Sequence, residues 1–69
     1  MKKNKPRTKL WNIRKNAGMT RRQLSDISGV SFDTICGYES GGRDIKGARY
    51  ITLYLLASAL NCKIEDIIE

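Results

Sequence analysis

The 69-residue sequence contains no histidine, only two cysteines and no long apolar run. Without histidine, and with Cys36 and Cys62 far apart in the chain, neither a zinc-finger ligand set nor a Cys-His nucleophilic pair can form. No stretch approaches the roughly 18 apolar residues of a membrane span, and no apolar segment follows the basic N-terminus as it does in a signal peptide. We therefore expect a cytoplasmic protein that holds no metal or cofactor and is not an enzyme.

Acidic residues are absent from the first 25 positions, which carry nine lysines and arginines. Residues 26–69 carry four basic and seven acidic side chains, so the net charge of +6 is concentrated at one end. Such a patch favours a polyanion, either nucleic acid or an anionic membrane, although a solubilising tail has the same composition. Leu10 and Trp11 are too few to form a membrane-binding helix face, so no membrane partner is expected. We expect a flexible basic arm at residues 1–6 and a single domain at residues 7–69.

Apolar residues recur at spacings of three and four along most of the chain, which is typical of helices, and no segment alternates with the period of two expected of strands. Gly18, Gly29 and Asn61 follow apolar runs and predict helix ends. Between residues 40 and 49 the sequence is glycine-rich and polar, which indicates a loop. The sequence therefore predicts a compact all-α domain of five helices, at about 7–17, 21–28, 32–39 and 48–60, with a short fifth helix within 63–69.

The second and third predicted helices carry strong start and turn signals. Thr20 and Gln23 fit a capping box, and Ser31 is placed to cap the following helix. Gly29 lies between them and can adopt the positive φ that a steep three- or four-residue turn requires. Small or apolar residues stand where two such helices approach each other, namely Leu24, Ser25, Val30, Ile35 and Tyr38.

The stretch "MTRRQLSDISGVSFDTICGYESGGR" resembles the helix-turn-helix of the phage repressor and Cro (XRE-type) family of DNA-binding proteins. The resemblance continues through "ITLYLLASALNCKIEDII" and covers residues 8–68. It implies a lambda-repressor-like fold with a helix-turn-helix at about 20–39, whose second helix enters the major groove. It also implies a sequence-specific regulator of transcription that binds double-stranded DNA in a prokaryote or phage, most simply as a repressor.

By this resemblance, the base-reading positions are Ser31, Phe32, Asp33, Cys36 and Gly37. Phe32 can contact a thymine methyl group or be a partly buried aromatic residue of the core. Asp33 can accept a hydrogen bond from a cytosine amino group or complement the helix N-terminus. The predicted reading helix has no Arg, Lys, Gln or Asn, so we expect few direct base contacts and more readout through methyl groups, water and DNA shape. Gly37 allows a close approach to DNA or is a small residue tolerated at an exposed site.

Positive charges around the motif are the candidate phosphate contacts. Arg21 is the strongest of them, because the family binds a phosphate at the first residue of this helix, where the helix N-terminus assists. Further candidates, each of which can instead be a solvated charge, are Arg22, Arg43, Lys46, Lys9, Arg7 and Lys5. The resemblance also implies a structural ion pair between Arg14 and Glu39 that is partly buried and fixes the reading helix.

Family members usually bind two half-sites about 34 Å apart as dimers. We therefore consider a homodimer, formed in solution or only on DNA, through the fifth helix, the start of the fourth or the loop around Ile45. Exposed ends of Ile67 and Ile68 favour such a dimer. The alternative function is a protein-interaction module, such as an antitoxin or anti-repressor, whose mark is an exposed apolar patch on the last two helices. No small-molecule ligand is expected.

Overall fold

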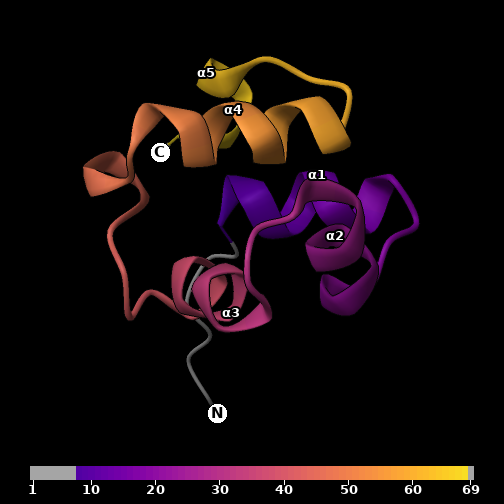
Figure 1. The fold of residues 1–69 in the computed structure, drawn as a ribbon, viewed down its shortest axis with the longest axis horizontal. Coiled ribbons are helices and arrows are strands. Elements are labelled where there is room, and N and C mark those ends of the chain that lie inside the picture. The colour runs from indigo at the N-terminus through magenta and orange to yellow at the C-terminus, as the bar shows by residue number, and fades with distance from the viewer. Residues whose placement is uncertain (1–7, 69) are drawn as a thin grey trace, which may run out of the picture.

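The computed structural model describes residues 8–68, in which every regular element is a helix and there is no strand. The α-helices are α1 (Lys9–Asn16), α2 (Arg21–Ser28), α3 (Phe32–Ser40), α4 (Tyr50–Ala59) and α5 (Ile64–Ile67), with a 3₁₀ turn η1 (Ile45–Gly47). Figure 1 shows α3 at one end of the molecule and α4 with α5 at the other, with α1 and α2 between them. The prediction of a compact all-α, five-helix fold is confirmed. No helix in this described range has the length and apolar character needed to cross a bilayer.

The helix-turn-helix is fixed by the local signals in its sequence. The Thr20 hydroxyl accepts a hydrogen bond from the Gln23 N–H (3.0 Å), and the Gln23 side-chain oxygen accepts one from the Thr20 N–H (2.8 Å). Gly29 ends α2 in the left-handed region, at a φ of 80°. The Ser25 hydroxyl donates to the Val30 carbonyl (2.7 Å), which ties α2 to the turn. Satisfied caps at both ends of the turn therefore set the direction in which α3 leaves α2.

Two predicted helices are longer than the observed ones. The first begins at Lys9, because the Thr8 hydroxyl accepts the N–H of Trp11 (3.1 Å) and caps the helix there. The fourth begins at Tyr50, because Ala48 and Arg49 have extended backbone angles. The segment 40–49, predicted as a loop, contains η1, which places the Ile45 side chain in the core.

Each of the five α-helices within residues 8–68 contributes one side chain that has no exposed area: Leu10, Leu24, Ile35, Leu56 and Ile67. Together with six further buried residues they form a single core. Burial of each such side chain contributes about 1.5–3 kcal/mol relative to an exposed one, so every helix depends on the others for its stability. Trp11 is only half-buried.

Candidate nucleic-acid interface

Glu39, at the end of α3, is held by two hydrogen bonds from α1. The Arg14 Nε donates to Glu39 Oε2 (2.8 Å) and its Nη2 donates to Oε1 (3.0 Å), while Nη1 donates to the Met19 carbonyl (2.8 Å). The side chains of Arg14 and Glu39 are only 6% and 1% exposed. The structure thus brings together the two residues predicted to form a structural ion pair. A charged pair so well buried and so fully hydrogen-bonded holds α3 in one orientation against α1.

A second arginine, Arg21, shares the same carboxylate. Its Nε donates to Glu39 Oε1 (2.8 Å), although its side chain remains 43% exposed at the first residue of α2. This hydrogen bond and the nearby negative charge raise the pKa of the Arg21 guanidinium above its already high ordinary value. The sequence does not predict this contact, since the resemblance pairs Glu39 with one arginine only. Glu39 therefore orients a permanently charged side chain at the N-terminus of α2.

The start of α3 borders a basic hollow of about 400 Å³. The Arg22 guanidinium lies over the Phe32 ring, 4.5 Å from its centroid, and Lys15 Nζ lies 5.6 Å from the centroid of the Trp11 ring. Phe32 is half-buried, so its ring is partly covered without being a core residue. The residues that line this hollow are Trp11, Arg14, Lys15, Met19, Thr20, Arg21, Arg22 and Phe32. Four of these side chains are cationic, which suits the hollow to an anion such as a phosphate group.

Of the other predicted base-reading residues, Asp33, Cys36 and Gly37 lie on α3, and Ser31 is the N-cap residue just before it. Ser31 and Asp33 are exposed, whereas Cys36 and Gly37 are half-buried. The Ser31 hydroxyl is engaged as the cap of α3, where it accepts the Thr34 N–H (3.1 Å). Asp33 stands in the first turn of α3, where a carboxylate complements the helix dipole. Ser31 therefore serves the start of the helix, and Asp33 retains both of the roles considered for it.

The remaining candidate cations lie on different elements. Lys9 is the first residue of α1 and Lys46 lies in η1, and both are exposed. Arg43 follows α3 and lines a pocket with Arg49, a cation that no motif in the sequence distinguishes. Arg7 and Lys5, like the predicted basic arm at 1–6, lie outside the described residues.

Both cysteines are free thiols and half-buried. Burial, with a smaller contribution from the charge of Asp66, raises the pKa of the Cys62 thiol. Because the thiolate is the reactive form, Cys62 is expected to react slowly at neutral pH. This is consistent with a packing role for the Cys62 side chain, which lies against the core.

The comparison with protein-family models gives one match relevant to this geometry. A family model described as helix-turn-helix matches residues 12–67, from α1 to the last residue of α5. No curated protein and no solved structure matches the chain. The matched range includes the capped turn, the buried Arg14 and Glu39 pair and all of the described core except Leu10. The chain belongs to the phage repressor and Cro-like (XRE-type) family of helix-turn-helix DNA-binding regulators.

Proposed function

We propose that the protein is a cytoplasmic, sequence-specific transcriptional repressor that inserts α3 into the major groove of double-stranded DNA and blocks a promoter. The observation that carries this proposal is the Glu39 cluster, in which Arg14 and Arg21 hold the end of α3 while α2 presents its N-terminus beside it. A reading helix needs such a rigid support, because misplaced side chains lose base contacts. Family membership supplies the DNA-binding function itself.

The charged residues divide into two roles in this proposal. Arg21 and Arg22 bind phosphates at the N-terminus of α2, where the helix dipole and two guanidinium groups attract the same anion. Lys9 and Lys46, with Arg7 and the arm at residues 1–6, add further phosphate contacts. Base edges are read from α3, by Phe32 and Asp33 with Ser31, Cys36 and Gly37.

Binding of the purified protein to a pool of random duplexes tests the proposal. The titration is repeated at several salt concentrations, and the bound duplexes are sequenced. We expect a steep salt dependence and one enriched, two-fold symmetric site, and we expect that site to reduce transcription when it overlaps a promoter. Binding that disappears near physiological salt without any enriched sequence contradicts the proposal, because it reports attraction by the basic end alone.

Arg21→Ala is expected to weaken binding to all duplexes alike and to reduce the slope of log K against log salt by about one unit, because one phosphate contact is lost. The matched control is Lys63→Ala, which removes one positive charge before α5, at the end of the molecule away from α3 (Figure 1). The control should keep the parent slope. If Arg21→Ala binds like the parent at both low and high salt, the proposed orientation of α2 on DNA is wrong.

The exposed side chains of α4 favour a second interaction surface. Tyr50, Ile51 and Tyr54 are 70%, 53% and 50% exposed, and the two tyrosine rings stack with centroids 6.3 Å apart. By contrast, Ile67 of α5 is fully buried and Ile68 is half-buried, so α5 offers less apolar surface to a partner. We therefore place the contact between two copies of the protein at the start of α4. A different protein bound there is the second candidate function, as in an antitoxin or anti-repressor.

Tyr54→Ser is expected to reduce cooperative binding of two copies to the enriched symmetric duplex while leaving binding to a single half-site unchanged. The reason is that the substitution removes apolar contact area at the end of the molecule opposite α3 (Figure 1). Sedimentation of the protein with each duplex counts the bound copies. Unchanged cooperativity places the dimer contact elsewhere, and the absence of any enriched duplex favours the protein-interaction function.

A further inference from the structure

The side chain of Arg43 lies across α3 at Gly37. A Cβ atom built on Gly37 stands 2.7 Å from Arg43 Cδ, 2.9 Å from Cγ and 3.0 Å from Nε, so any other residue at position 37 requires the Arg43 side chain to move from this position. The backbone supports the same arrangement, because the Arg43 N–H donates to the Gly37 carbonyl (3.0 Å). Gly41, at a φ of 89°, turns the chain so that Arg43 returns to the helix it has just left. Gly37 thus leaves space on the surface of α3 for the side chain of Arg43 from the following loop, and we call this packing site of Arg43 on Gly37 the seat.

This seat lies on the face of α3 that the resemblance assigns to DNA. Gly37 follows Asp33 by four residues, so the two positions share one side of the helix, and Cys36 lies beside them. Residues 31–39 include no Arg, Lys, Gln or Asn and therefore supply no long hydrogen-bond donor of their own. Arg43 adds a guanidinium group to a surface that otherwise offers mainly short side chains.

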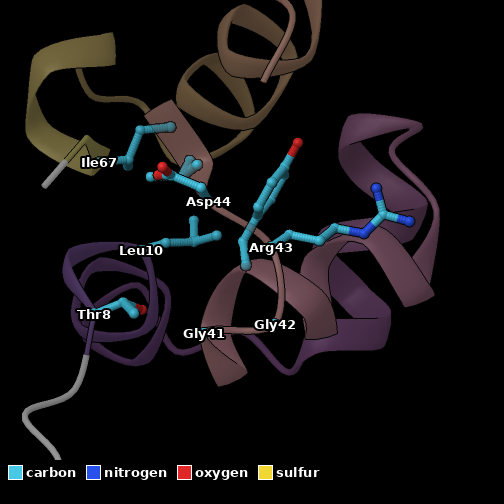
Figure 2. Close-up of a pocket in the computed structure, with 9 residues that line it drawn as sticks. Thr8, Leu10, Gly41, Gly42, Arg43, Asp44 and Ile67 are labelled. Carbon is cyan, nitrogen blue, oxygen red and sulfur yellow. The ribbon is translucent and has the colours of Figure 1, made fainter. Parts of the chain in front are cut away.

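The Arg43 side chain is directed outward rather than into the protein. Figure 2 shows it leaving the pocket beside α3, with its guanidinium group on the side away from Thr8 and Leu10. Arg43 is exposed, and within residues 8–68 no carboxylate forms an ion pair with it. Its position therefore depends on the contact with Gly37 and not on an internal charge partner.

We infer that Arg43 is a specificity-determining residue that reads a guanine from its seat on Gly37. With α3 in the major groove, its guanidinium group donates two parallel hydrogen bonds to guanine O6 and N7, the geometry that arginine matches best. The inference rests on the proposed function, and it replaces the phosphate contact for which Arg43 is a candidate by its charge. It also explains the glycine inside α3 without a close approach to DNA: position 37 has no side chain because the Arg43 side chain packs there.

Sequencing of selected duplexes tests this role with Arg43→Ala, Gly37→Ala and the double variant. The parent is expected to select guanine at one position of each half-site. Arg43→Ala should lose about tenfold or more of that preference and keep the preferences at other positions, because one bidentate base contact is removed. Gly37→Ala should lose it too, since the new methyl group displaces Arg43, and the double variant should behave like either single one. Alanine favours a helix more than glycine does, so Gly37→Ala is expected to remain folded, which a thermal melt checks.

Lys46→Ala is the matched control, because it removes a charge from the same loop without touching Gly37. It should weaken binding to all sequences equally. If Arg43→Ala does the same, Arg43 contacts a phosphate and the inference is overturned, while DNA binding by the parent still supports the proposed function. If Gly37→Ala keeps the guanine preference that Arg43→Ala loses, Arg43 does not need Gly37 for its position on DNA, and that part of the inference is wrong. If the parent selects no sequence, the proposed function fails and the inference fails with it.

Discussion

Replacing Glu39 with alanine is expected to lower the free energy of unfolding by about 3–5 kcal/mol, the cost typical of breaking a buried ion pair from one side. The Glu39 carboxylate accepts two hydrogen bonds from Arg14 and one from Arg21, and its side chain is 1% exposed. Without it, the buried Arg14 guanidinium keeps its charge but loses its compensation. Because small domains have a free energy of unfolding of only about 5–15 kcal/mol, this variant should unfold at low urea concentration, which circular dichroism measures.

Two further variants test whether the loss of the buried ion pair causes this destabilisation. Glu65→Ala removes a carboxylate from an exposed position of α5 and should change stability by no more than about 0.5 kcal/mol. The double variant Arg14→Met, Glu39→Leu removes both buried charges and should recover much of the loss, because apolar residues of similar size often replace a buried pair without penalty. A Glu39→Ala variant within about 1 kcal/mol of the parent would show that water compensates Arg14, against the burial in the structure.

The parts of the fold that the sequence predicted well are those set by interactions within about four residues. The capping box of Thr20 and Gln23 and the positive φ of Gly29 are local, and they place α2 within the predicted bounds. Apolar spacing was less exact at α1 and α4, because it continues beyond the residues that are helical. Ala48 carries an apolar side chain toward the core, yet its backbone is extended, so α4 starts later than the pattern suggests.

In the candidate site, the contacts that could be predicted differ even more clearly from those that depend on the whole fold. The pairing of Arg14 with Glu39 could be carried over from the resemblance, because both residue types stand at matching positions. The contact of Arg21 with Glu39 and the seat of Arg43 on Gly37 join segments whose relative orientation depends on the whole core. No spacing in the sequence encodes such contacts. The helical glycine was the one local sign, since it costs about 1 kcal/mol relative to alanine and therefore calls for a reason in packing or function.

Ile35→Ala is the second substitution for which we expect a large effect, a loss of about 2–5 kcal/mol in the free energy of unfolding. Ile35 is the fully buried side chain of α3, so the smaller residue leaves a cavity between α3 and the rest of the core. The cost combines the lost transfer of apolar atoms from water with the cavity that the neighbouring helices cannot close. Urea titration measures the loss directly.

Ile27→Ala makes the identical chemical change at a site on α2 that is 59% exposed, and it should alter stability by no more than about 0.5 kcal/mol. The two variants also separate stability from recognition. Ile35 faces the core rather than the DNA, so the folded fraction of Ile35→Ala should select the same duplex sequence as the parent, with an apparent affinity reduced only by the unfolded fraction. A changed base preference in the folded Ile35→Ala variant would mean that α3 has moved. The core and the Glu39 cluster would then fix the orientation of the reading helix jointly, and neither would suffice alone.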